Sequence, residues 1–290
     1  MIKTWKTVLL LVGCLIAAQP LPVQYEEMSA PQFLQALERS GKICIIPLGI
    51  LEKHGPHLPL GTDLLDVRRI CLLAAEQEYA VVFPPYYFGQ IYEAQHQPGT
   101  IAYRPQLVWN ILQETCDELG RNGFEKIILV NGHGGNNYFL PYFCQAQLQS
   151  PRSYAVFLFQ PEEDPAISEE VRKLRKTATG GHADEEETST LLSHRPDLVH
   201  TEKAGEQSGE DLNRLAGLTH AYTGIWWYAK YPNHYAGDGR YADPRIGNLL
   251  INSEARQLAD LIKRLKTDHR PLELLREFYK QAAQPTKTPQ

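Results

Sequence analysis

The sequence has few cysteines, no excess of positive charge and one long apolar run, and each feature excludes a class of protein. Five cysteines in 290 residues, with no Cys-x-x-Cys pair, favour buried free thiols over a disulfide framework. A net charge of −5 and a pI of about 6.1 provide no basic field for a nucleic acid. The mean hydropathy of −0.36 argues against a membrane protein with several spans. Repeats and low-complexity linkers are also missing, so a globular chain of one large domain, or two at most, is expected.

The long apolar run lies at the amino terminus and is typical of an export signal. Two lysines precede the apolar residues 7–18, and two prolines follow. This pattern predicts a signal peptide over about residues 1–18, in a run that is short for a membrane span. Cys14 ends a Leu-Val-Gly-Cys sequence that resembles a lipoprotein box, so a lipid anchor is the alternative. We therefore expect an exported protein, periplasmic or secreted.

Apolar strands alternate with amphipathic helices along the rest of the chain. The pattern predicts strands over 43–48, 80–83, 126–130 and 154–159, and helices over 63–77, 104–121, 136–148, 185–192 and 247–265. Continuous apolar strands between helices are typical of a parallel sheet covered on both faces. We predict an α/β fold, a three-layer α/β/α sandwich with a mostly parallel central sheet. It would form one domain over residues 25–280, followed by a polar tail at 281–290.

The first group of candidate site residues follows the strand predicted over 43–48. In parallel sheets, ligands bind beyond the carboxyl ends of the strands. Glu52 and His54 are two residues apart in a proline-interrupted segment, so their side chains point to the same side. Asp63, at the start of the next helix, can return to the same place and bridge two metals. The alternative is that Asp63 caps its helix and His54 packs in a loop, and spacing alone does not decide between them.

The second group, Asn-Gly-His-Gly-Gly-Asn, follows the strand predicted over 126–130. His133 lies at the turn from strand to helix. Gly134 and Gly135 let the backbone approach a ligand, and their N–H groups could face developing negative charge. The sequence is neither a phosphate-binding loop nor a dinucleotide fingerprint. A tight turn with an incidental histidine is the alternative.

The third group is an acidic stretch in which His182 precedes Glu185, Glu186 and Glu187. One interpretation is a solvated helix start, since acidic residues are favourable in the first turn. The other is a histidine paired with carboxylates for proton transfer or metal binding. On a regular helix, Glu185 and Glu187 point about 200° apart, so they cannot serve one site in the same way.

Together these groups resemble the creatininase (creatinine amidohydrolase) family. The resemblance runs in order over roughly residues 30–265 and is carried by the motifs at 47–63, 97–100, 130–136, 182–189 and 239–245. It implies an α/β/α sandwich that assembles into oligomers, commonly hexamers. It also implies two divalent metal ions per chain, zinc, manganese or iron, and hydrolysis of a C–N bond in a small-molecule amide.

Carried over residue by residue, the resemblance implies a ligand set. Glu52 and His133 would bind one metal, and His54 would bind the other. Asp63 would bridge the two metals, and His182 would transfer a proton near the substrate.

The family pattern is incomplete at one ligand position. Creatininase has a glutamate metal ligand at the position of Gly135, which has no side chain. It has an apolar residue at the position of Glu185, and this reciprocal change predicts that Glu185 supplies the missing ligand from a different loop. The alternative is that water fills the position. Glu187 is present in both and would act in the catalytic group, where it orients His182 or braces the helix.

The residues that would hold creatinine are mostly absent. Pro161, Ala178 and Thr179 stand where creatininase has an aromatic, a tryptophan and an aspartate. Relatives with the Gly-His-Gly-Gly-Asn form include a deformylase of flavin-type cofactor biosynthesis and a peptidase of mycofactocin maturation. Creatinine itself is therefore not expected as the substrate.

These observations predict an exported metal-dependent amidohydrolase that uses a two-metal-activated water. Five aromatic residues are candidates for the pocket wall: Tyr86, Tyr87, Trp226, Trp227 and Tyr228. One alternative is a metal-dependent lactone or phosphoester hydrolase. A phosphate substrate usually requires Arg or Lys near the metals, and only Lys53 is obvious. A second alternative is a non-catalytic ligand-binding protein on the same fold.

Overall fold

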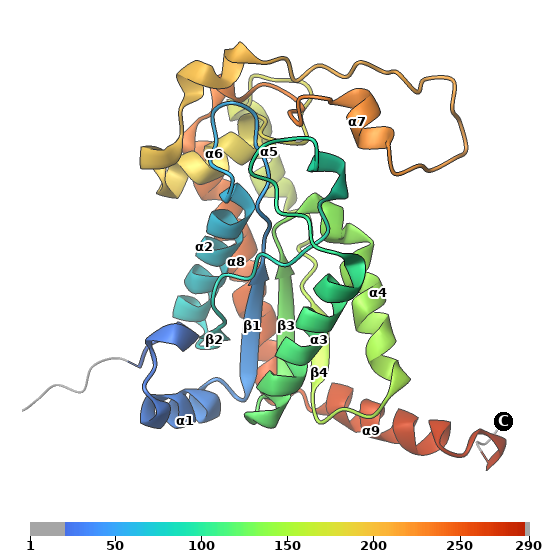
Figure 1. Cartoon of the computed structure of the whole chain (residues 1–290). Helices are drawn as coiled ribbons and strands as arrows, with labels where there is room; N and C mark the ends of the chain where they lie inside the picture. Colours follow the sequence, from blue (N-terminus) through green and yellow to red (C-terminus); the bar gives the residue numbers. More distant parts are fainter. Residues whose placement is uncertain (1–20, 288–290) are drawn as a thin grey trace, which may run out of the picture.

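A four-stranded, all-parallel sheet forms the centre of the computed structural model, which describes residues 21–287. The expected signal peptide over 1–18, with Cys14, lies outside the described residues. The strands are β1 (Ile43–Leu48), β2 (Val81–Val82), β3 (Lys126–Asn131) and β4 (Ala155–Leu158), in the order β2-β1-β3-β4 (Figure 1). The predicted α/β class and parallel sheet are confirmed.

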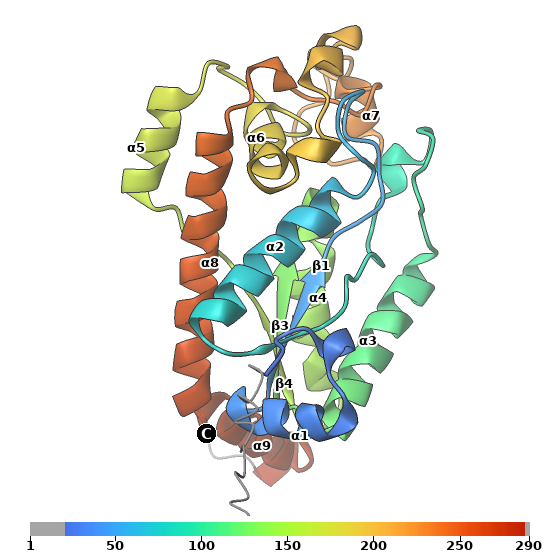
Figure 2. The same cartoon turned by 90° about the vertical axis from the view of Figure 1, so that its left-hand side faces the viewer.

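Helices cover both faces of the sheet and complete the three layers (Figures 1 and 2). One face carries α2 (Thr62–Gln77) and α8 (Pro244–Thr267), and α5 (Pro165–Leu174) and α6 (Glu185–His194) pack against α8. The other face carries α1 (Ala30–Arg39), α3 (Pro105–Arg121) and α4 (Phe139–Ala146). The short α7 (Trp226–Lys230) and the C-terminal α9 (Arg270–Ala282) lie at opposite ends of the molecule (Figure 1).

The strand β1 shows why the central strands are apolar throughout. Ile43 and Ile45 pack into the core beneath α2 and α8, whereas Cys44 and Ile46 pack into the core on the α3 side. Alternate side chains of a strand point to opposite faces, and here each face is covered by helices. All six residues of β1 are therefore buried. The four described cysteines are free, as expected, and three of them are buried.

Some helix boundaries differ from the prediction. The helix expected over 136–148 is divided into the 3-10 turn η3 (Gly134–Asn137), α4 and a second turn at 147–149. The Asn136 side chain donates to Asn131 and accepts from the Gln90 backbone, which holds the η3 backbone out of a continuous helix. The helices α1, α5, α7 and α9 lack a prediction, and the expected polar tail contains one 3-10 turn, Pro285–Lys287. Within residues 21–287, none of the helices has the length and apolarity needed to cross a bilayer.

The fold brings the loops after β1 and β3 to one place. The strand order reverses between these two strands, which is where ligands bind in open α/β sheets. Two glycines let the first turn of α2 approach both strand ends. A Cβ on Gly49 would lie 2.5 Å from the Leu64 nitrogen, and one on Gly132 would lie 2.9 Å from the Asp63 carbonyl oxygen. This close packing places the Asp63 side chain between the two loops.

Candidate metal centre

Glu52, Asp63 and His133 form the first group of converging side chains, and all three are buried. His133 Nδ1 lies 2.8 Å from Glu52 Oε1 and 3.0 Å from Asp63 Oδ2. The Nε2 atom of the same ring lies 2.8 Å from the Gln90 carbonyl oxygen, to which it donates its proton. In the neutral ring, the lone pair of Nδ1 therefore faces two carboxylate oxygens. Such an arrangement requires a cation or a proton at its centre.

His54 and Glu187 form a second group on the other side of Asp63. His54 Nε2 lies 2.8 Å from Asp63 Oδ1 and 3.6 Å from Glu187 Oε1. The Nδ1 atom of His54 lies 3.2 Å from the Glu52 carbonyl oxygen, so a backbone contact again fixes the ring and leaves the other nitrogen for the cluster. Asp63 contributes one oxygen to each group, as a bridging ligand would.

The charges in this cluster are strongly coupled. Burial alone would lower the pKa of His54, but Asp63 and Glu187 outweigh it and hold the pKa well above its usual value. Burial would likewise lower the pKa of His133, and Glu52 and Asp63 raise it well above its usual value. Burial would raise the pKa of the Glu187 carboxyl, yet His54 lowers it to about 2. The acidic side chains of the cluster therefore stabilise positive charge on the two imidazoles, and His54 in turn stabilises the ionised form of Glu187.

Two buried oxygen atoms test whether a metal fits. Glu52 Oε1 and Asp63 Oδ2 are inaccessible to solvent and accept no hydrogen bond from a described residue. Unpartnered carboxylate oxygens beside an imidazole nitrogen are expensive to bury unless a cation coordinates them. Histidine and carboxylate ligands suit zinc and manganese. The side chains of Glu52, Asp63 and His133 therefore fit a divalent ion. On the other side of Asp63, His54 and Glu187 converge with His182 in a second group of potential ligands.

The structure places Glu187 beside His54 and does not bring Glu185 to the cluster. Glu185 is fully buried, and its carboxylate accepts hydrogen bonds from the backbone nitrogens of Lys176 and Thr177 at 2.7–3.0 Å. The two glutamates are two residues apart on α6, so one side chain points away when the other faces the metals. The expectation that Glu185 replaces the ligand missing at Gly135 thus disagrees with the geometry, which assigns that place to Glu187.

His182 and the two glycines expected near the substrate line the same cavity as the cluster. The His182 ring lies against that of His54, with centroids 4.4 Å apart. Its Nε2 donates to the Lys53 carbonyl oxygen at 2.8 Å, and its Nδ1 lies 3.8 Å from Glu187 Oε2. The expected catalytic pair is therefore adjacent, with His182 Nδ1 free of a backbone partner.

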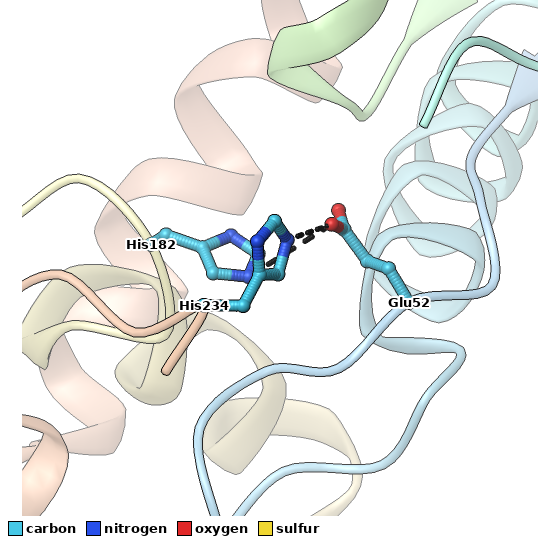
Figure 3. Close-up of side chains that lie close together, drawn as sticks. All are labelled: Glu52, His182 and His234. Carbon is cyan, nitrogen blue, oxygen red and sulfur yellow. Dashed lines mark hydrogen bonds and ion pairs between the residues drawn. The ribbon is translucent and has the colours of Figure 1, made fainter. Parts of the chain in front are cut away.

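His234 is a site residue that the sequence analysis missed. Its Nδ1 accepts a hydrogen bond from Trp227 Nε1 at 2.9 Å, which leaves the ring proton on Nε2, and Nε2 donates to Glu52 Oε2. Figure 3 shows the His234 and His182 rings together beside the Glu52 carboxylate. Although these three side chains are close enough to hold an ion, the facing nitrogens of both rings carry protons, so His234 orients Glu52 instead. No spacing signal marks His234, because 182 residues separate it from Glu52.

The cluster lies at the inner end of a cavity of about 1110 Å³. Six aromatic residues also line the cavity: Tyr92, Tyr138, Tyr222, Trp226, Trp227 and Tyr228. Trp227 lies beside His182 and His234, whereas the exposed Tyr138, Tyr222, Trp226 and Tyr228 form the outer rim. The three aromatics predicted from 226–228 are thus in the wall. The other two predicted wall residues are not: Tyr86 is buried in the core on the α3 side, and Tyr87 does not line the cavity.

Comparison with known proteins identifies the family. The creatininase family model, described as creatinine amidohydrolase, matches residues 26–262. Creatinine amidohydrolase of Pseudomonas putida is 28% identical over 176 residues, which are 54% of this chain and 66% of that enzyme, just under two thirds of it. The 3-dehydro-scyllo-inosose hydrolase of Thermotoga maritima is 29% identical over 226 residues, 72% of this chain and 70% of that enzyme.

A solved structure has the same fold. The structure described as "Creatininase Mn" has a TM-score of 0.72 and 20% sequence identity, and the match covers 85% of this chain and 99% of that chain. The parallel sheet, the site at the ends of β1 and β3 and the match over residues 26–262 all agree. The chain therefore belongs to the creatininase family and is a creatininase-like hydrolase.

Proposed function

We propose that this protein is a metal-dependent amidohydrolase that uses two divalent ions to cleave a C–N bond in an amide or cyclic amide. The observation that carries the proposal is the pair of buried groups that share Asp63, each with an imidazole nitrogen facing carboxylate oxygens. One ion would be held by Glu52, Asp63 and His133, and the other by His54, Asp63 and Glu187. Bound ions would polarise the amide carbonyl and lower the pKa of the attacking water.

The protein's own groups would supply orientation and proton transfer. The backbone contact of His182 Nε2 fixes its ring, so that Nδ1 serves the leaving nitrogen. Glu187 Oε2, 3.8 Å from that Nδ1, stabilises the imidazolium that forms when His182 carries the proton. The backbone N–H groups of Gly134 and Gly135, which line the cavity, stabilise negative charge on the carbonyl oxygen.

Zinc or manganese is the proposed metal, supported by the ligand set and by the solved creatininase described with manganese. The substrate is proposed to differ from creatinine, although the Pseudomonas relative is named for that activity. Ala178 and Thr179, which depart from the creatininase pattern, do not line the cavity. The creatinine-holding contacts therefore have no counterpart at these positions.

A phosphoester substrate is disfavoured by the cavity wall. Among the described residues that line it, none is lysine or arginine. The nearest candidate was Lys53, but its ammonium group donates to Gln207 Oε1 and to the Asn233 carbonyl oxygen, both at 2.6 Å. These contacts hold the Lys53 side chain away from the cavity. Phosphate recognition usually requires cationic groups at the phosphate, so an amide is the better substrate class.

Metal analysis combined with a substrate screen tests the proposal. Purified protein should carry about two zinc or manganese ions per chain after reconstitution, and Asp63→Asn should lose both, since Asp63 contributes to each group. A panel of amides, formamides and lactams should contain a substrate whose hydrolysis stops on chelation and returns with metal. Full metal occupancy without turnover of any panel member would instead support a non-catalytic ligand-binding protein.

We also propose that the protein acts outside the cytoplasm, on the basis of the apolar run over residues 7–18. Cell fractionation of the producing organism, with mass determination of the mature amino terminus, tests this. A mature chain that retains residue 1 would contradict it.

A further inference from the structure

A fourth carboxylate faces the cavity and has no role in the cluster described above. Glu93, in the 3-10 turn η2 (Tyr92–Ala94), is half-buried and lines the cavity with Glu52, Asp63 and Glu187. Its Oε2 accepts a hydrogen bond from Gln90 Nε2 at 2.8 Å. No lysine, arginine or histidine among the described residues forms an ion pair with it.

Glu93 is held close to the reacting end of the cavity. A Cβ on Gly135 would lie 2.9 Å from Glu93 Oε1 and 2.5 Å from His133 Nε2, so the carboxylate lies above Gly135 and beside the His133 ring. The Asn136 side chain accepts from the Gln90 backbone nitrogen, and this contact fixes the loop that carries Glu93. The position of Glu93 is thus set by two contacts independent of any ligand.

Aromatic residues line the same cavity as Glu93. Tyr228 and Trp226 line it from α7, and the exposed Tyr138 and Tyr222 line it as well. The Tyr228 ring lies 4.8 Å from that of His96, and the α7 segment contacts the η2 turn that carries Glu93. Aromatic faces attract cations, most strongly where water is partly excluded.

Glu93 adds a carboxylate to the cavity wall that belongs to neither proposed metal group. Glu52, Asp63 and Glu187 would contact the ions, whereas Glu93 is in none of the groups of converging metal-ligand atoms and forms no ion pair among the described residues. A half-buried carboxylate that has no ion-pair partner is stabilised when a ligand supplies the positive charge.

We propose that the substrate of this site is a cationic amide, whose ammonium or amidinium group is bound by Glu93 and the aromatic rim while its amide reaches the metal cluster. The proposal rests on the proposed amidohydrolase function and names the substrate class. Glu93 is then a specificity-determining residue, and the ring of Trp226 forms an aromatic wall of the cation site. The Tyr228 ring already carries a cation of the protein, the Arg214 guanidinium, 4.9 Å from the ring centroid.

Three benzamides that differ only in charge test the proposal. At pH 7, 4-(aminomethyl)benzamide carries a positive charge, 4-methylbenzamide is neutral and 4-carbamoylbenzoate is negative. Their binding to the zinc-loaded full chain is measured by calorimetry, with hydrolysis followed separately. The cationic compound should bind about ten-fold more tightly than the neutral one, since hydrogen bonds to charged groups and contacts of cations with aromatic faces strengthen binding. The anionic compound should bind most weakly.

The variant Glu93→Gln removes the charge and keeps the shape of the side chain. It should abolish the preference for the cation, leave binding of 4-methylbenzamide within about two-fold and retain both metals. Glu163→Gln is the matched control, because Glu163 is exposed and lies outside the cavity, so it changes net charge equally. The control should preserve the ten-fold preference.

The outcomes separate this proposal from the amidohydrolase proposal. Preferential binding of the cation without hydrolysis of any amide supports the cation site and contradicts the proposed reaction. Equal binding of the three compounds, absence of binding by all three, or a preference that persists in Glu93→Gln overturns the cation site. Loss of a metal ion in Glu93→Gln also overturns it, because Glu93 would then be a metal ligand.

Discussion

The two ends of the cavity are built in different ways. The inner end is made from buried side chains on the first residues beyond two central strands and on the starts of α2 and α6. The outer end is made from exposed aromatics between η3 and α4 and on the segment that leads into α7, where Tyr138 and Tyr222 are 78% and 71% exposed. Chemistry common to a family can therefore be fixed at the inner end while the outer end changes with the substrate.

The largest effect should come from replacing Glu187 at the inner end by glutamine, compared with the same replacement of Glu185. Glu187→Gln removes a carboxylate beside His54 and should lose about one metal ion per chain, with turnover reduced at least 100-fold, since even outer contacts of a metal site contribute 10–100-fold. Glu185→Gln should keep both ions. It should lower the melting temperature by about 5 °C, because the amide NH₂ group would face the Lys176 backbone N–H, from which Glu185 Oε1 accepts, and two donors would then meet in a buried site.

Elemental analysis of the two variants measures their metal content, and scanning calorimetry measures their melting temperatures. Exposed Glu163→Gln serves as the control for handling and net charge. Metal loss in Glu185→Gln with full occupancy in Glu187→Gln would restore the sequence-based assignment and contradict the geometry.

The inner end could largely be predicted from sequence, for a physical reason. Glu52, His54 and His133 directly follow apolar strands, and the carboxyl ends of parallel strands meet at one edge of the sheet. The sequence could not predict which of Glu185 and Glu187 faces the metals. Helical geometry excludes a shared role for the two side chains, but it does not determine which of them points inward. Only the packing of α6 on α8, where a Cβ on Gly247 would lie 2.0 Å from the Ser189 carbonyl oxygen, sets that rotation.

The role of His234 could not be predicted from the sequence, because its main partner Glu52 lies 182 residues away in the chain. Glu52 and Trp227 bond to it from two segments, and no local pattern brings them together. The same holds for Glu93, whose turn is placed by Asn136 through Gln90. Central strands are specified by local apolar runs, whereas such long-range polar contacts depend on the complete fold.

A smaller effect on metal binding should follow from removing His234, which orients the Glu52 carboxylate at the inner end. His234 has φ +51°, in the left-handed region, which asparagine tolerates. His234→Asn therefore keeps the backbone and removes the imidazole that orients Glu52. Affinity for the metal that Glu52, Asp63 and His133 would hold should fall about 10–100-fold, measured by competition with a chelating dye. Exposed His200→Asn is the matched control, and unchanged affinity in His234→Asn would show that Glu52 is oriented without His234.

A group of acidic residues lies behind the metal cluster, and its protonation should make the stability of the inner end depend on pH. Glu254 on α8 faces Asp66 on α2, whose Oδ1 lies 2.7 Å from His194 Nε2 on α6, with Asp63 and Glu187 nearby. Burial and then repulsion by Asp66 raise the pKa of Glu254 to about 7. The folded state thus favours the protonated form of Glu254. Its contribution to stability is fully present below the unfolded pKa of about 4.3 and is lost as the pH rises through the folded pKa of about 7.

Glu254→Gln removes this loss without changing the shape of the side chain. Its melting temperature should exceed that of the wild type by about 5 °C at pH 8, and the difference should shrink toward zero at pH 5. Scanning calorimetry at the two pH values, with Glu163→Gln alongside, measures it. A difference that is the same at both pH values would show that ionisation of the buried Glu254 is not the cause.

The smallest effect should come from the rim. The Tyr222 ring contacts that of Tyr138 with centroids 6.0 Å apart, and both rings are mostly exposed, so Tyr222→Ala should change the free energy of unfolding by less than about 0.5 kcal/mol. Metal content should be unchanged, because neither ring contacts a residue of the cluster. The KM of an amide substrate should rise a few-fold at constant kcat, since a lost rim contact weakens binding without touching the reacting atoms. A fall in kcat or in metal occupancy would mean that the rim and the cluster act as one unit, and the separation of the two ends would no longer hold.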